Sequence, residues 1–233
     1  MYATFVGDRL EGGQCPAKKR AGLVCYNFPM DPLNKLIEYF SEFPGIGPRQ
    51  AKRFAYFLLT KNPSYLESLS RNITELKQSI KTCGDCFRFF TKDTADSTLC
   101  SICRDPHRDL SLLMVVSRDV DLETIEKSRS FNGRYFILGG SVPILEKSPE
   151  SRIRSKELLR YIERNGTALK EIILALNANP EGENTADYLR SLLSPLTERK
   201  LFTISLLGRG LSTGTELEYS DSDTITNALK NRA

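Results

Sequence analysis

The sequence predicts an α+β chain of several modules: a helical N-terminal module, a small four-cysteine module, an α/β domain with a parallel sheet, and a C-terminal helix. Three observations predict this fold class. Two amphipathic stretches flank a Pro-Gly-Ile-Gly turn, and two Cys-x2-Cys pairs follow with 13 residues between them. Beyond the pairs, short apolar runs alternate with helical patterns, which is the order of parallel strands joined by helical crossovers.

Composition and charge narrow the classes of function. The chain has 233 residues, of which 40% are hydrophobic and 27% charged, as in ordinary globular proteins. A net charge of +4 allows a polyanionic partner only where basic residues are locally concentrated. The longest apolar run, Phe54 to Leu59, has six residues, whereas a bilayer span needs roughly 20, so a membrane-spanning protein is excluded. We find no secretory signal and expect a reducing cytoplasm, where paired cysteines favour a metal over disulfides.

Residues 1–29 are expected to form an unstructured extension. They contain several glycines and prolines and the cluster Lys18-Lys19-Arg20, and they show no sustained helical or strand period. One hypothesis is that Met30 is the natural start of the protein. The alternative is that the extension is a basic arm.

Three helices are predicted for a module over residues 30–81. The first follows Asp31, a plausible N-cap, and begins at Pro32, because proline suits the first helical position. The second runs from Pro48 to Thr60, and the third from Pro63 to Ile80. Apolar residues at helical spacing form one face of the first two helices: Leu33, Leu36, Ile37 and Phe40, then Ala51, Phe54, Ala55, Leu58 and Leu59.

An α/β domain is predicted over residues 108–207. The apolar runs expected to be its buried parallel strands are Leu112–Val116, Tyr135–Leu138, Ile172–Leu176 and Phe202–Leu207. The helices expected between them are Leu122–Ser130, Ile153–Asn165 and Thr185–Leu196. The remaining segment, 208–233, is expected to end in a helix over Ser222–Lys230.

Four cysteines predict a metal site in a module over residues 82–107. The ligands are Cys83, Cys86, Cys100 and Cys103. Two chelating pairs at this spacing can fill the tetrahedron of a Zn²⁺ ion, and a filled tetrahedron has no open position for catalysis, so the zinc is expected to be structural. The intervening residues 87–99 are long enough to return as a small ribbon. The alternatives are four unliganded cysteines or a redox pair, and His107 is expected to be an ordinary surface residue.

The turn between the first two helices predicts a contact with a nucleic-acid backbone. Gly45 and Gly47 can adopt the backbone angles of a tight turn and leave amide N–H groups uncovered. Arg49, Lys52 and Arg53 place three cations in the first two turns of the next helix, at its positive end. This describes a helix-hairpin-helix that holds phosphates without reading sequence. The alternative is an ordinary turn beside a solvated basic face.

This order of modules resembles the RecR family of bacterial recombination mediators over residues 30–233. The residues that carry the resemblance are the turn Phe43–Pro48 with Arg49 and Arg53, both cysteine pairs, Tyr135–Gly140, Pro180–Glu183 with Thr185 and Ala186, and the run Gly208–Leu211, Gly214 and Glu216–Tyr219.

The resemblance implies a function in recombinational DNA repair. The α/β domain would be a Toprim domain, and the chain would assemble into a homotetrameric ring that encircles DNA. Its partners would be single- and double-stranded DNA, bound without sequence preference, and the proteins RecO and RecF. With them it would help to load recombinase onto gapped or single-stranded DNA, in the bacterial cytoplasm at the nucleoid.

The residues argue separately against an enzyme. Toprim enzymes hold Mg²⁺ with a strand-end glutamate and an Asp-x-Asp pair. Here Ser117 follows the first predicted strand, and Asn177-Ala178-Asn179 follows the third. Neutral amides bind Mg²⁺ poorly, so we expect no phosphoryl-transfer activity. The alternatives are a Mg²⁺-dependent Toprim nuclease or primase-like enzyme, and a zinc-bearing adaptor that binds only protein.

Three acidic residues near this edge are candidates for partner binding. Glu181, Glu183 and Asp187 could meet a basic partner surface or recruit a weakly held ion. The alternative is that they are solvated carboxylates at a helix start, where the helix dipole favours them. Phe136 stands where the RecR family commonly has histidine, on the face implied to meet RecO or RecF.

Overall fold

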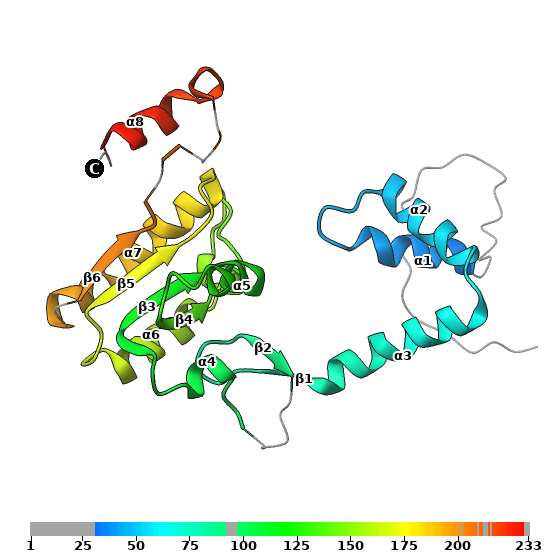
Figure 1. Cartoon of the computed structure of the whole chain (residues 1–233), viewed down its shortest axis with the longest axis horizontal. Coiled ribbons are helices and arrows are strands. Elements are labelled where there is room, and N and C mark those ends of the chain that lie inside the picture. Colours follow the sequence, from blue (N-terminus) through cyan, green and yellow to red (C-terminus); the bar gives the residue numbers. More distant parts are fainter. Residues whose placement is uncertain are drawn as a thin grey trace, which may run out of the picture. The chain divides into compact units, whose positions relative to one another are not determined.

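The computed structural model describes residues 31–91, 97–200, 202–208, 210–211, 214 and 216–230. The chain divides into two compact units, one that ends at Ser70 and one that begins at Arg71 (Figure 1). The predicted extension over 1–29 and the proposed start at Met30 lie outside the described residues.

The first unit is a helical hairpin that continues into a third helix. Helix α1 spans Pro32–Ser41, α2 spans Pro48–Leu59, and α3 spans Pro63–Ser79 and crosses into the second unit. As expected, the Asp31 side chain accepts a hydrogen bond from the Leu33 amide and caps α1. The hairpin closes because two alanines of α2 are fully buried and allow close approach, and because Phe40 of α1 meets Phe54 edge-on at 6.0 Å.

A small antiparallel ribbon begins the second unit. Strand β1 (Ile80–Thr82) pairs with β2 (Phe89–Thr91), and the short helix α4 (Ser101–Arg104) follows. We expected a ribbon within residues 87–99, between the two cysteine pairs. The strands instead lie on either side of the first cysteine pair in the sequence, because the turn that contains Cys83 and Cys86 connects β1 to β2.

A four-stranded parallel sheet forms the centre of the second unit. Its strands lie in the order β4-β3-β5-β6, and each neighbouring pair is parallel. The strands are β3 (Asp109–Val116), β4 (Gly133–Ile137), β5 (Glu171–Ala175) and β6 (Thr203–Leu206). The helices are α5 (Asp119–Ser128), α6 (Ser155–Asn165), α7 (Pro180–Lys200) and α8 (Ser222–Lys230), with single 3-10 turns at Pro149–Ser151 and Leu217–Tyr219. All four predicted strands are present, with ends that differ by at most three residues.

Helix α7 begins five residues before the predicted Thr185. The side-chain oxygen of Asn179 accepts a hydrogen bond from the Gly182 amide at 2.8 Å and so caps the helix. Pro180 then occupies the first helical position, which suits a proline.

Both faces of the sheet are covered, so its strands contribute alternate residues to two cores. On β3, Leu113 and Val115 pack with α6 and α7, whereas Met114 and Val116 pack with α5. The four cysteines belong to the same core cluster as Met114 and Val116. The cysteine module is therefore part of the packing of the sheet, on the α5 side.

An ion pair ties α5 to the start of β3. Arg108 donates two hydrogen bonds, of 2.8 and 2.6 Å, to the two carboxylate oxygens of Glu126. These bonds lower the pKa of Glu126 from its usual value of 4.5. A carboxyl group with a depressed folded pKa stabilises the fold above its unfolded pKa and loses that contribution as the pH falls through the folded value.

We expect Glu126→Gln to lower the free energy of unfolding by about 1–3 kcal/mol at pH 7. The difference from the parent should shrink below pH 4.5, which urea unfolding at pH 7 and at pH 4 will measure. Glu157→Gln is the control, because its pair with the exposed Arg160 is 4.0 Å long and should contribute less than about 0.5 kcal/mol. An equal loss at both pH values would contradict the assignment.

Candidate metal centre and nucleic-acid interface

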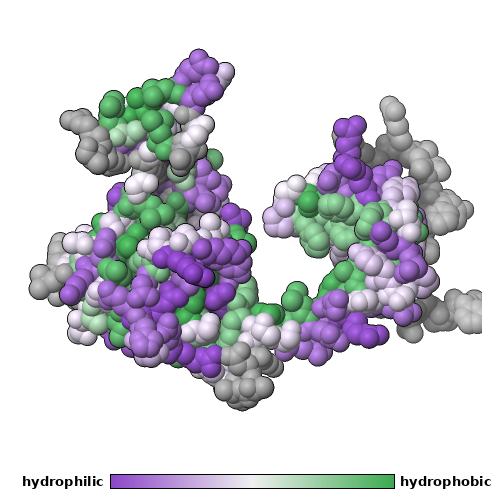
Figure 2. Space-filling view, in the orientation of Figure 1, coloured by the Kyte–Doolittle hydropathy of each residue, from purple (hydrophilic) through white to green (hydrophobic). Residues whose placement is uncertain are grey.

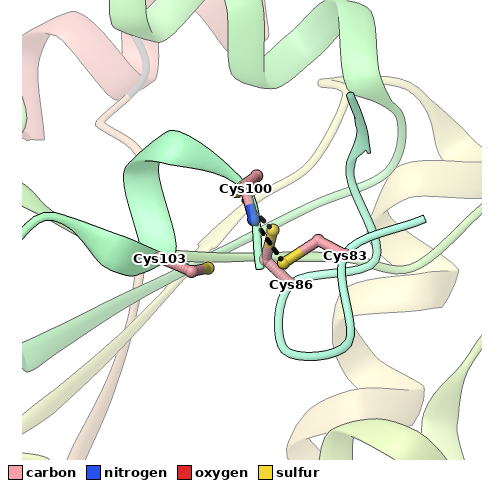
Figure 3. A group of neighbouring side chains, drawn as sticks. All are labelled: Cys83, Cys86, Cys100 and Cys103. Carbon is pink, nitrogen blue, oxygen red and sulfur yellow. Dashed lines mark hydrogen bonds between the residues drawn. The ribbon is translucent and has the colours of Figure 1, made fainter. Parts of the chain in front are cut away.

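The structure gathers the four predicted cysteines into one cluster. Their sulfur atoms all lie within 4.8 Å of one another, and the Sγ atoms of Cys86 and Cys100 are 3.6 Å apart (Figure 3). Thiolates at about 2.3 Å from a tetrahedral ion stand about 3.8 Å from each other, so the spacing fits such an ion. Among the described residues this is the only group of three or more potential ligands close enough to share a metal.

Local backbone geometry holds the sulfurs in place. The Cys83 amide donates to the Arg88 carbonyl at 2.8 Å, and the Phe87 amide donates to the Cys83 carbonyl at 3.1 Å. Phe87 has a φ of 61°, which tightens the turn around the first pair. The second pair starts α4, where the Cys100 amide donates to the Cys83 sulfur at 3.3 Å. The second cysteine pair is thus hydrogen-bonded to the sulfur of Cys83, which belongs to the first pair.

The four buried thiols do not ionise equally without a cation. Hydrogen bonds from neighbouring thiols, that of Cys100 foremost, lower the pKa of Cys83. The hydrogen bond between Cys86 and Cys100 raises the pKa of Cys86. A divalent cation supplies the charge that lets all four sulfurs act as thiolates. The donor set therefore fits a structural metal ion, and His107, which is exposed and outside the cluster, is not needed as a ligand.

The cysteine module is joined to the sheet by hydrogen bonds and aromatic packing. The Ile137 amide of β4 donates to the Cys86 carbonyl at 2.9 Å, and the Arg134 guanidinium donates to the Cys103 carbonyl. The Phe87 ring meets Phe136 edge-on at 5.4 Å. Phe136 therefore packs the turn that contains Cys83 and Cys86 against the sheet. The spacing of the cysteines gave no indication of this contact.

The predicted hairpin turn has the expected backbone. Gly45 has a φ of +77°, a conformation that favours glycine. Gly47 is the N-cap of α2 and makes no side-chain capping bond. Neither glycine has a neighbouring atom within 4 Å of the position that a Cβ would occupy. Within the described part of the chain, the amides of both residues donate to no backbone carbonyl, so they are available to a ligand.

The three predicted cations follow this turn on α2. Arg49, Lys52 and Arg53 are exposed, and Arg53 donates a 3.4 Å hydrogen bond to the neighbouring Gln50 side chain. No carboxylate among the described residues forms an ion pair with any of the three. They line one groove together with Tyr56, Phe57 and Thr60. Sequence reasoning missed the two aromatic residues, although they continue the helical spacing of the cations.

The carboxyl edge of the sheet holds neutral side chains where a Toprim enzyme would need carboxylates. Ser117 follows β3 and is 2% exposed, and its hydroxyl has no hydrogen-bond partner among the described residues. Asn177 is exposed, and Asn179 caps α7. The amide of Asn179 is thus engaged with the backbone.

The three predicted acidic residues lie on the first turns of α7 and are exposed. Glu181 accepts a 3.1 Å hydrogen bond from the Ser141 hydroxyl, and Asp187 pairs with Arg190 at 3.4 Å. Glu183 and Asp187 are four residues apart and share one side of the helix. The carboxylates do not form a metal-binding group among the described residues.

Within the described residues, none of the helices has the length and apolar character that crossing a membrane requires.

Three family models match consecutive parts of the chain. The model described as "RecR, helix-hairpin-helix" matches residues 33–77, a "Toprim domain" model matches 111–202, and "RecR, C-terminal" matches 210–233. They confirm the predicted order of a helix-hairpin-helix, an α/β Toprim domain with a parallel sheet and a C-terminal segment. The four-cysteine cluster lies between the first two matches.

Curated relatives match almost the whole of their own length. "Recombination protein RecR" of Paenarthrobacter aurescens (strain TC1) is 38% identical over 201 residues, which cover 86% of this chain and 95% of the relative. The protein of the same name from Myxococcus xanthus (strain DK1622) is 37% identical, with 87% and 97% covered. That from Syntrophobacter fumaroxidans (strain DSM 10017 / MPOB) is 39% identical, with 86% and 94% covered. With identity at this level over all three matched regions, the chain belongs to the RecR family of recombination proteins.

Proposed function

We propose that the protein is a non-enzymatic DNA-binding recombination mediator that acts as a zinc-stabilised clamp. In this proposal it binds single- and double-stranded DNA without sequence preference, forms a homotetrameric ring, and works with RecO and RecF in the bacterial cytoplasm at the nucleoid. The modules are the helix-hairpin-helix over 30–81, the cysteine module over 82–107, the Toprim domain over 108–207 and the C-terminal segment over 208–233, preceded by the extension 1–29.

The exposed basic face of the hairpin is the observation that carries the proposal. The free amides of Gly45 and Gly47 and the positive end of α2 favour a phosphate at the turn. The adjacent cations, Arg49, Lys52 and Arg53, extend the positive electrostatic potential along α2. Such contacts hold the backbone of a nucleic acid and carry no base information. Assembly of several chains would add these individually weak contacts into a stable grip.

The metal in this proposal is Zn²⁺, held by all four cysteines. A closed thiolate tetrahedron leaves no open position for a substrate, so the ion would serve the fold. At the carboxyl edge of the sheet, Ser117 and the asparagines cannot supply the negative charge that a catalytic Mg²⁺ requires. We propose that the carboxylates of Glu181, Glu183 and Asp187 instead form part of the surface that meets RecO or RecF.

The test is DNA binding by the full chain with Arg49→Ala and Arg53→Ala combined, over a salt series. Losing two phosphate contacts per hairpin should weaken binding to duplex and single strands by at least about tenfold. It should also reduce the slope of log affinity against log salt by about two for each hairpin engaged. Fluorescence anisotropy with labelled oligonucleotides measures both quantities, and light scattering records the mass of the assembly.

The matched control is Lys156→Ala with Arg160→Ala, which removes two exposed cations from α6. Its affinity should stay within about twofold of the parent. Unchanged binding after the hairpin substitutions would show that these cations do not hold DNA, and absence of DNA binding by the parent would favour the adaptor that binds only protein. Cleavage of DNA that depends on Mg²⁺ would instead favour the Toprim nuclease.

A further inference from the structure

A stripe along α2 joins the cations to two aromatic rings. Counting from Arg49, its members follow at three, four, seven, eight and eleven residues, which is the spacing of one helical face. The stripe consists of Arg49, Lys52, Arg53, Tyr56, Phe57 and Thr60, and these residues line one groove of about 810 Å³. Charged groups therefore occupy the half near the Gly45–Gly47 turn, and aromatic groups occupy the other half.

The two rings are not needed to close the hairpin. Tyr56 and Phe57 are 48% and 49% exposed, whereas Ala51 and Ala55 on the opposite side of α2 are fully buried. Figure 2 shows hydrophobic surface exposed beside hydrophilic side chains on the unit that contains α1 and α2. Solvent-exposed aromatic pairs next to cations are more typical of a binding surface than of a core.

Cations also surround the rings. The Lys61 ammonium lies 4.3 Å from the centroid of the Phe57 ring, and the Lys52 ammonium lies 5.9 Å from that of Tyr56. These are the distances of cation–π contacts. The aromatic half of the groove thus has a positive potential, and an occupant needs both negative charge and flat apolar surface.

Unpaired nucleotides meet both requirements. Their phosphates match the cations, and their bases match the rings, because every base has a face that stacks on an aromatic side chain. A second copy of this hairpin would instead bring three cations against three cations, which costs free energy. A duplex keeps its base faces stacked inside and cannot use the rings.

We propose that Tyr56 and Phe57 form a stacking platform for unpaired bases, so that the hairpin grips single-stranded DNA at two levels. The amides and cations hold its phosphates, and the rings hold one or two of its bases. Arg49 and Tyr56 are about 10 Å apart along the helix axis, room for a few nucleotides. This inference rests on the proposed function, because it assumes that the basic face binds DNA.

Tyr56→Ala combined with Phe57→Ala in the full chain tests the platform. Loss of stacking should weaken binding to an oligo(dT) strand by about 10- to 100-fold, whereas binding to a blunt duplex should stay within about twofold. An abasic strand of equal length should bind the parent and the variant alike. Because both side chains are exposed, thermal unfolding should be unchanged.

A direct optical readout is available because the chain contains no tryptophan. Tyr56→Trp should retain strand binding, and its fluorescence should be quenched by oligo(dT) and not by the abasic strand. Absence of this quenching, or an equal loss of duplex and strand binding in the alanine variant, would overturn the platform. A fall in the mass of the assembly in that variant would assign the surface to a second copy instead. If the parent binds neither nucleic acid, the proposed function fails; if it binds both and the rings have no effect, only this inference fails.

Discussion

Replacing Cys86 by serine should release the metal and destabilise the whole sheet unit as well as the cysteine module. Cys86 is fully buried, and its carbonyl accepts the Ile137 amide of β4. Structural zinc contributes about 10–16 kcal/mol of apparent binding free energy in small modules, and entire domains are stable by only about 5–15 kcal/mol. Losing even part of that contribution should lower the Tm by more than about 10 °C.

Metal analysis and calorimetry of the full chain will check this result. The parent should carry about one zinc per chain, whereas Cys86→Ser should carry little. Cys15→Ser, which removes a cysteine outside the quartet, is the control and should keep both the metal and the Tm. If the parent instead contained iron, the site would be an iron–sulfur centre and not a zinc site, because four thiolates can hold either metal. A Cys86→Ser protein with full metal content would show that this sulfur is not a ligand.

Gly182→Ala should be strongly destabilising, although helix propensity alone predicts the opposite. A glycine inside a helix usually costs about 1 kcal/mol relative to alanine. Here a Cβ would lie 2.0 Å from the carbonyl oxygen of Asn177 and 2.9 Å from its carbonyl carbon. Backbone atoms cannot turn aside as a flexible side chain can, so the first turn of α7 must move. We expect a loss of about 2–4 kcal/mol in the free energy of unfolding.

Urea unfolding gives both the sign and the size of this effect. Gly208→Ala is the matched control, since nothing lies within 4 Å of its Cβ position, and it should change stability by less than about 0.5 kcal/mol. A stabilised Gly182→Ala protein would mean that the backbone of the loop after β5 can shift to accommodate the added Cβ. The absence of a Cβ at Gly182 allows the loop after β5 to lie close to the start of α7, where Asn179 serves as the cap.

The sequence predicted elements well where one local pattern was sufficient. The four strands follow from apolar runs, and the cysteine cluster follows from the spacing of its pairs. The start of α7 was placed too late because Gly182 weakens the helical pattern, while the capping bond of Asn179 lies just outside it. Prediction from local patterns therefore failed first at the ends of elements.

Contacts between residues that are distant in the sequence also could not be predicted from local patterns. The helical period predicted Phe54 and Leu59 on the apolar face of α2, yet they remain 37% and 67% exposed. In a two-helix hairpin, each helix covers only part of the apolar face of the other. The helical period does not indicate which residues cover the remainder. Likewise, Phe87 and Phe136 are 49 residues apart in the chain. Only the fold reveals that their rings join the turn containing Cys83 and Cys86 to the sheet.

The shared core of cysteines and sheet has a consequence for synthesis of the protein. All four cysteines precede β3, so a nascent chain that leaves the ribosome carries the full ligand set before any strand of the sheet has emerged. With the proposed ion bound, the small module would offer an apolar surface on which the later strands can assemble. Newly made chains in a zinc-starved cell would lack this template and would expose the apolar side chains of β3 and β4 to aggregation and proteolysis.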